Sequence, residues 1–180
     1  MKLDVPLKTL GPVNYQALKF AVEDAPAEAW LEEEIRQKSF DVHKATQSII
    51  LLFTTGWPEI NVSQHKGWRK FSPLALPIMH DIIARHYSPK GTVIRAMFAR
   101  LLAGRKIDEH FDDHPTFTLA HRIHVPLITS DAVEFNISGV NHHLKEGIAY
   151  EVSNLDYHYV ANPTNKDRVH FIFDYVEDEQ

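Results

Sequence analysis

Short runs of β-branched and aromatic residues, separated by Gly, Pro, Asn and Asp, fill the second half of the chain. The runs after Gly91 are TVIRAMFARLLA, TLAHRIHVPLIT, AVEFNIS, IAYEVS and RVHFIFDYV. Five strands at this spacing, with the turn NPTNKD before the last, favour an antiparallel sandwich or barrel. We therefore expect a core like a jelly roll over residues 91–178.

The first half mixes helical and strand patterns. Residues 14–37 carry helical spacing with a break at Pro26, whereas TQSIILLFTT (46–55) is a β-branched run typical of a buried strand. These elements precede the expected core, so we predict helices that cover it.

A further helix is predicted over residues 72–87. Ser72 is a suitable N-cap, and Pro73 fits the first helical turn because proline lacks the amide hydrogen that is unused there. The preceding stretch TTGWPEINVSQHKGW (54–68) reads as a loop.

The length of 180 residues favours one domain with a sizeable core. We find no linker or internal repeat between a mixed, partly helical N-terminal part (1–90) and the β-rich part (91–178). The predicted fold class is therefore α+β, mainly β, in a single domain over 1–180.

Charge and composition exclude several classes of function. A formal net charge of −5 without a basic run argues against binding to nucleic acid or to an anionic membrane. The chain has no cysteine, so any metal must take nitrogen and oxygen ligands. The N-terminus has no apolar signal segment, and no apolar run is long enough for a membrane span, so we expect a cytoplasmic protein.

The segment HFDDH (110–114) contains His-x-x-x-His, the spacing of zinc proteases. In those enzymes two histidines share one face of a helix, and a glutamate base follows the first histidine. Phe111 occupies the position of that base, and Pro115 follows a pair of aspartates that favour turns. These features argue against a zinc protease.

The alternative motif is His110-x-Asp112. In an extended chain these two side chains point to the same face and can share one metal ion. A histidine from a distant strand would complete a facial triad that leaves three positions open on octahedral Fe(II), and His158 is the best candidate.

Arg168 follows ten residues after His158. A turn centred on NPTNKD would make the two flanking strands a hairpin and bring these residues together. The guanidinium fork suits a carboxylate, so iron and arginine together match the needs of 2-oxoglutarate, which chelates iron at its keto-acid end. The competing interpretation of Arg168 is a structural ion pair with Asp167 or Asp156.

The combined pattern of His110-x-Asp112, His158 and Arg168, with RIHVPL between and DRVHFIFD at the end, resembles the aspartyl/asparaginyl β-hydroxylase family of 2-oxoglutarate oxygenases. Bacterial proline hydroxylases share it. The similarity covers roughly residues 91–176. It implies a double-stranded β-helix (jelly-roll) core, Fe(II) held by the three ligands, and Arg168 on the far carboxylate of 2-oxoglutarate.

The resemblance also implies roles for Arg122-Ile123-His124. In the family an Arg-x-His on this strand lines the pocket, which places His124 near the keto-acid carboxylate and Arg122 beside it as a second co-substrate-binding residue. A polar contact that some members make from the strand before the triad corresponds to Ala99 here, so it is not expected.

Alternation along RIHVPL supports this placement independently. Arg122 and His124 fall on one face with Pro126, while the apolar residues between them fall on the other, where they would pack under the N-terminal helices. A strand with a polar inner face and an apolar outer face fits the wall of a site.

The remaining histidines read as structural. His121 falls on the apolar face and is expected to be satisfied by hydrogen bonds, His114 lies at the mouth of the pocket, and the pair His142-His143 beside a turn is expected to be exposed. His170 shares its strand face with Arg168 and is expected to lie behind the site.

The function expected from these features is hydroxylation of a C–H bond with O2 and 2-oxoglutarate, releasing succinate and CO2. The substrate class suggested by the resemblance is a free amino acid or an Asp/Asn residue in a peptide, with a preference for small amino-acid-like molecules. Two alternatives remain: a cupin-type metal enzyme that does not use 2-oxoglutarate, and a non-catalytic jelly-roll binding module. Cupin sites usually present His-x-His with a further Glu, which this chain lacks here.

Overall fold

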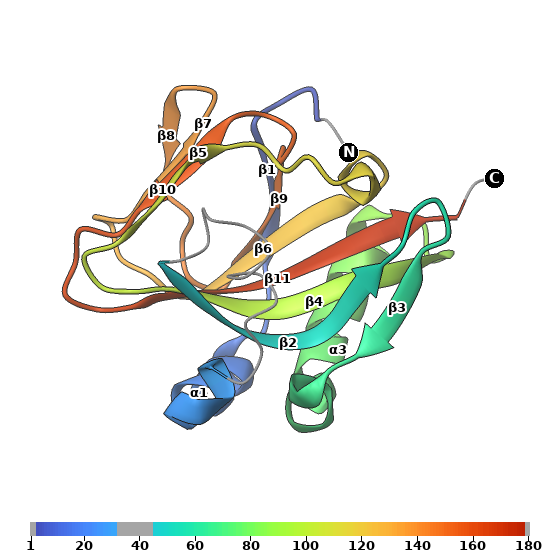
Figure 1. The fold of residues 1–180 in the computed structure, drawn as a ribbon, viewed down its shortest axis with the longest axis horizontal. Coiled ribbons are helices and arrows are strands. Elements are labelled where there is room, and N and C mark those ends of the chain that lie inside the picture. Colours follow the sequence, from blue (N-terminus) through green and yellow to red (C-terminus); the bar gives the residue numbers. More distant parts are fainter. Residues whose placement is uncertain (1–2, 32–44, 179–180) are drawn as a thin grey trace.

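Two antiparallel β-sheets form the protein, with helices on one side of the larger sheet (Figure 1). The structure is a computed structural model that describes residues 3–31 and 45–178. The expected mainly β, jelly-roll-like architecture is confirmed. None of the helices in the described residues is both long and apolar enough to cross a membrane.

The larger sheet contains seven strands in the order β1-β9-β6-β11-β4-β2-β3. In that order, the strands are Leu7–Pro12 (β1), Ile148–Val152 (β9), His121–Ile128 (β6), Arg168–Glu177 (β11), Gly91–Leu101 (β4), Thr46–Thr55 (β2) and Asn61–Gln64 (β3). The run predicted as a buried strand over 46–55 is β2, with the same bounds.

The smaller sheet contains four strands in the order β5-β10-β7-β8. They are Lys106–His110 (β5), His158–Ala161 (β10), Glu134–Ile137 (β7) and Val140–His142 (β8). All five strands predicted from apolar runs after Gly91 are present. The runs did not identify β5, β8 and β10, although a strand at His158 was expected from the turn NPTNKD. Each of these has only three to five residues, so none contains an apolar run long enough to be recognised.

Among the described residues, the α-helices Gln16–Glu23 (α1) and Lys66–His86 (α3) and the 3-10 helix Ala27–Trp30 (η1) precede β4. Another 3-10 helix, Pro115–Thr118 (η3), lies between β5 and β6. The break expected at Pro26 separates α1 from η1, and the part of that prediction after Leu31 lies outside the described residues.

The start predicted for the second helix was wrong. α3 begins at Lys66, so Ser72 and Pro73 lie inside it, and the stretch read as a loop contains β3 and the first helical residues. The helix starts early because its first turn packs on β2: a Cβ on Gly67 would lie 2.7 Å from the carbonyl oxygen of Ile50, so only glycine permits this approach.

The main hydrophobic core lies between the helices and the larger sheet. Ile123, Val125 and Leu127 of β6 belong to it together with Leu18 of α1 and Phe71 of α3, as the alternation along RIHVPL predicted. A second cluster, which includes Ile107, Phe135 and Val160, lies on the inner side of the smaller sheet. The large sheet thus has helices on one face and the smaller sheet on the other.

The expected hairpin between the strands around NPTNKD does not form. β10 pairs with β5 and β7, whereas β11 pairs with β4 and β6, so the connection crosses from one sheet to the other. The side-chain amide of Asn162 donates hydrogen bonds to the carbonyls of Leu102 and Lys166, at 3.3 and 2.8 Å, and this holds the connection in the crossing path.

Candidate metal centre

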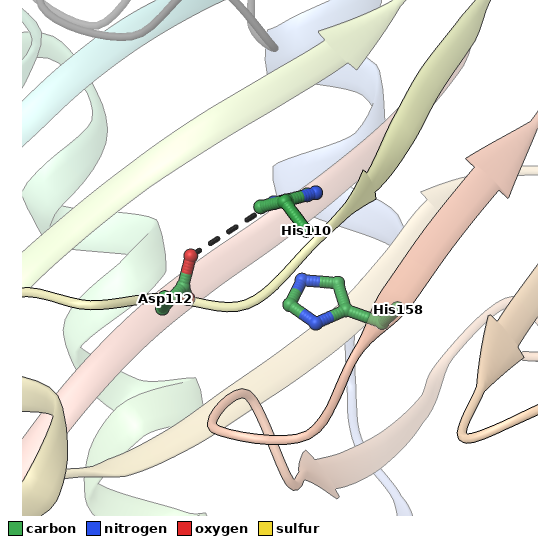
Figure 2. Close-up of side chains that lie close together, drawn as sticks. All are labelled: His110, Asp112 and His158. Atoms are coloured by element: carbon green, nitrogen blue, oxygen red, sulfur yellow. Dashed lines mark ion pairs between the residues drawn. The ribbon is translucent and has the colours of Figure 1, made fainter.

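Three side chains with metal-binding atoms meet on the small sheet. His110 is the last residue of β5, His158 is the first residue of β10, and the two are direct partners across these strands. Asp112 follows β5, and its backbone amide donates to the carbonyl of Asn154 at 2.9 Å. One ligand atom from each of the three lies within 4.8 Å of the others (Figure 2).

Both histidines are oriented by the backbone. Nδ1 of His110 lies 2.8 Å from the carbonyl oxygen of Asp108, and Nδ1 of His158 lies 2.9 Å from that of Asp156. A carbonyl oxygen only accepts, so each Nδ1 carries the hydrogen and each Nε2 keeps its lone pair. This tautomer is the one that binds a metal through Nε2, and the second hydrogen bond fixes the ring.

One oxygen of Asp112 is held by neighbours and the other faces the histidines. Oδ2 accepts from Nη1 of Arg122 at 2.9 Å and from Nδ2 of Asn154 at 3.1 Å, while Oδ1 lies 3.9 Å from Nε2 of His110 (Figure 2). Burial alone would raise the pKa of Asp112, but Arg122, His158 and the hydrogen bond from Asn154 lower it to about 2. The carboxylate is therefore ionised and directed towards the histidines.

The donor set fits a divalent iron. Two imidazole nitrogens and one carboxylate oxygen on one side of a site form the facial triad of non-haem Fe(II) oxygenases. Burial keeps the pKa of His158 below its ordinary value, so this imidazole is neutral and able to bind a metal at neutral pH.

A cavity opens beside the triad between the two sheets. Its volume is about 540 Å³ including its open mouth. The wall near the triad is polar, with Arg122, His124 and Asn154, and the remaining wall is mainly apolar: Ala99, Ile107, Phe135, Val152, Val160 and Ile172. The cavity is lined by all six residues that the sequence predicts for the site: His110, Asp112, Arg122, His124, His158 and Arg168.

Arg168 contributes a buried positive charge to the cavity. It is the first residue of β11, is 3% exposed, and lies with its guanidinium carbon 5.9 Å from the centre of the Phe135 ring. Asp167 pairs with Arg100 instead. Arg168 therefore reaches the site from the large sheet, opposite the histidines of the small sheet, and not through the hairpin expected from the sequence.

Arg122 and His124 also line the cavity, as the alternation predicted. Arg122 makes two hydrogen bonds to Asp174 in addition to the one to Asp112. His124 lies with Nδ1 3.3 Å from Nδ1 of His170, which is buried behind the cavity wall as expected. Burial, together with neighbouring arginines, keeps the pKa of both histidines well below the ordinary value, so both are neutral.

The sequence reading missed four residues of the site. Thr46 lines the cavity from β2 and is paired with Leu101, which is also the partner of Arg168, so Thr46 and Arg168 flank the same position of β4. Phe135 and Asn154 had no signal in the sequence. Asp174 had one, since it lies on the same face of its strand as Arg168 by the alternation of β11.

Most other histidines have structural partners. Nδ1 of His121 lies 2.5 Å from Glu151, and Nδ1 of His114 lies 2.9 Å from Oγ1 of Thr116. His142 and His143 are half-buried, so the prediction that they are exposed was wrong; Nε2 of His143 lies 3.1 Å from Asp131, which draws that side chain against the surface.

Comparison with known proteins agrees with the geometry. Residues 21–178 match the protein family described as Aspartyl/Asparaginyl beta-hydroxylase. No curated protein matches the chain. Since this family match spans most of the chain, it establishes the family, including for the region before residue 91.

Solved structures share the fold at low sequence identity. The nickel complex of the non-haem monooxygenase ThoJ has a TM-score of 0.58 and 15% identity, over 96% of this chain and 74% of that chain. A viral collagen prolyl hydroxylase from Paramecium bursaria Chlorella virus-1, in complex with 2-oxoglutarate, has a TM-score of 0.56 and 11% identity, over 98% of both chains. A prolyl-4-hydroxylase from Pseudomonas putida has a TM-score of 0.52 and 12% identity, over 98% and 95%.

The jelly-roll fold, the His-Asp-His cluster and the sequence match over residues 21–178 lead to one conclusion. This chain belongs to the aspartyl/asparaginyl β-hydroxylase family of Fe(II)- and 2-oxoglutarate-dependent oxygenases.

Proposed function

We propose that the protein hydroxylates a C–H bond of a free amino acid, or of an Asp or Asn residue in a peptide, with Fe(II) bound by His110, Asp112 and His158. The observation that carries this proposal is the convergence of the three ligand atoms within 4.8 Å, with both imidazoles oriented to present Nε2. Bound iron supplies the activation of O2, coupled to conversion of 2-oxoglutarate into succinate and CO2.

Arg168 is the residue proposed to hold the far carboxylate of 2-oxoglutarate. Its guanidinium carbon lies 5.9 Å from the centre of the Phe135 ring in the cavity, on the sheet opposite His110 and His158. A guanidinium in such surroundings favours a bidentate carboxylate partner. Thr46, which flanks the same position of β4, lines the same cavity.

His124 is proposed to contact the keto-acid end of the co-substrate. It lines the same cavity as the triad and Arg168 and is neutral because burial keeps its pKa well below the ordinary value. A neutral imidazole can donate one hydrogen bond to a carboxylate without adding a further charge to the site. Arg122 acts on the same wall by holding Oδ2 of Asp112.

The chain's own contribution to the reaction is therefore position and exclusion of water. The backbone carbonyls hold the histidine rings, Arg122 and Asn154 hold the carboxylate, and the apolar wall limits the water that reaches the iron-facing side of the cavity. No side chain is required as an acid or base for breaking the C–H bond.

Anaerobic Fe(II) titration tests the metal assignment. We expect one Fe(II) per chain in the wild type and loss of tight binding in His110→Ala and in His158→Ala, because each removes one of the three ligands. Asp112→Ala should retain weak binding through the two histidines. His80→Ala, which changes an exposed histidine of α3, is the matched control and should bind as the wild type does.

A succinate-release screen across free amino acids and short peptides tests the reaction and the substrate class. Succinate formation stimulated by one of them supports a hydroxylase for that substrate. Tight Fe(II) binding without any succinate from 2-oxoglutarate would refute the proposed use of this co-substrate.

A further inference from the structure

A row of alternating charges runs from the triad into the interior of the larger sheet. Asp112 contacts Arg122, Arg122 contacts Asp174, and Asp174 contacts Nη1 of Arg95 at 3.2 Å. Asp174 is fully buried and lies between the two guanidiniums. Among the described residues, the hydrogen bonds of its carboxylate go to arginines and not to the three residues of the triad, so any effect of Asp174 on the metal centre must be indirect.

The geometry around Arg122 links Asp174 to the metal centre. Asp174 accepts from Nε of Arg122 through Oδ1 and from Nη2 through Oδ2, both at 2.9 Å. The guanidinium is a rigid plane, so two hydrogen bonds on one edge fix the direction of its remaining nitrogen. That nitrogen, Nη1, is the one that donates to Oδ2 of Asp112.

We propose that Asp174 is a positioning residue of the metal centre: through Arg122 it fixes the orientation of the Asp112 carboxylate, with one oxygen held by Arg122 and the other facing His110. The inference rests on the proposed function, because it assumes that Asp112 binds the metal. With the edge of Arg122 held by Asp174, Oδ2 stays engaged and Oδ1 stays directed towards His110.

The far end of the row anchors the segment that follows Asp112. Nη2 of Arg95 donates to Oγ1 of Thr116 at 2.8 Å. The centre of the Phe117 ring lies 4.6 Å from the guanidinium carbon of Arg95 and 4.4 Å from that of Arg122. Asp174 therefore supports the carboxylate ligand from two directions, through Arg122 directly and through the segment of η3.

Glu151 provides a matched control. It is also a buried carboxylate of the larger sheet, and its side-chain partners are His121, Tyr87 and Lys8. It is paired with Ile123, whose side chain belongs to the helix-facing core, so it lies on the face away from the triad. A loss of metal affinity that follows from damage to the sheet alone would appear in Glu151→Gln as well as in Asp174→Asn.

The experiment is a double-mutant cycle on Fe(II) affinity, measured by anaerobic titration of the full chain. Removing residues that orient metal ligands typically weakens binding about 10- to 100-fold, and we expect a loss in that range for Asp174→Asn. In the Asp112→Ala background the same substitution should cause no further loss, because the ligand it positions is gone. Glu151→Gln should retain wild-type affinity.

The absorption spectrum of bound Co(II) gives a readout that a purely structural role would not change. We expect Asp174→Asn to shift the spectrum towards that of Asp112→Ala, since the coordination of the ion changes in both. Where Asp174→Asn does not fold, the charge-balanced Asp174→Asn/Arg95→Gln variant replaces it, with the same expected loss because Arg122 has lost its anchor.

The outcomes distinguish a wrong ligand set from a wrong role for Asp174. Wild-type Fe(II) affinity in Asp112→Ala would overturn the proposed ligand set. With that ligand set intact, wild-type affinity in the tested Asp174 variant, an equal loss in Glu151→Gln, or an equal loss with and without Asp112 would each overturn the positioning role.

Discussion

Arg168→Ala separates recognition of 2-oxoglutarate from binding of the metal. Arg168 is 3% exposed and its guanidinium carbon lies 5.9 Å from the centre of the Phe135 ring, so a carboxylate beside it is shielded from water. Hydrogen bonds to charged groups contribute about 1.5 to 3 kcal/mol net. At about 1.4 kcal/mol per tenfold change, the affinity for 2-oxoglutarate should fall roughly 10- to 150-fold. Fe(II) affinity should remain unchanged because Arg168 is not a member of the triad.

Two further variants sharpen this measurement. Arg168→Lys should recover part of the loss, since an ammonium keeps the charge but lacks the planar fork. Arg100→Ala is the matched control: Arg100 belongs to β4 of the same sheet, pairs with Asp167 and does not line the cavity. Binding is measured on the anaerobic Fe(II) protein through the metal-to-ligand charge-transfer band of 2-oxoglutarate. Equal affinities in the wild type, Arg168→Ala and Arg168→Lys would refute the assignment.

Three other predictions concern pH and stability. Fe(II) affinity should fall as the pH drops from 7 towards 5, because protons compete with the metal for the imidazole nitrogens. Burial lowers the pKa of His158, so protonation of this side chain begins only below about 6.5. Anaerobic titrations at several pH values measure the affinity. The free energy of unfolding of the apo protein should fall as the pH drops below about 6.5, by up to about 1.4 kcal/mol per pH unit for each of His124 and His170. Burial lowers the pKa of both side chains, so the unfolded chain takes up protons before the folded one does. Equal stability in urea unfolding at pH 7, 6 and 5 would contradict the buried neutral state. Phe171→Ala should lower the free energy of unfolding by about 3 to 5 kcal/mol, because Phe171 is fully buried in the main core, and denaturant titration of the apo protein measures it.

Sequence alone was sufficient for the elements with long regular patterns. β2 and the five predicted strands after Gly91 have runs of β-branched and aromatic residues that identify them. The helix α3 was predicted, but its predicted start at Ser72 lies six residues after the observed start at Lys66. Ser72 and Pro73 form a local start signal that packing against β2 overrides. Local signals report what a segment prefers, whereas Gly67 reveals its role only when its neighbour in space is known.

As with the secondary structure, the parts of the site that depend on local sequence patterns could be predicted. The proposed ligands His110 and Asp112 lie two positions apart in the chain, so their shared face could be predicted from the alternation of a strand. The same alternation along β6 placed Arg122 and His124 on the inner face. The route by which Arg168 reaches the cavity was not readable, because strand partners depend on contacts between distant segments. For the same reason, the sequence did not reveal that Asn154 and Asp174 hold the groups around the triad.

The division of the cavity between two sheets has a consequence for how such proteins diversify. The two histidines proposed as ligands come from β5 and β10 of the small sheet, whereas Arg168 and Thr46 come from the large sheet. Substitutions on the large sheet can therefore alter the molecules that bind without changing the metal ligands, and selection can act on the two walls separately. The contact of Arg122 with Asp112 crosses this division, so mutations at Arg122 should be the hardest for a diverging lineage to accept.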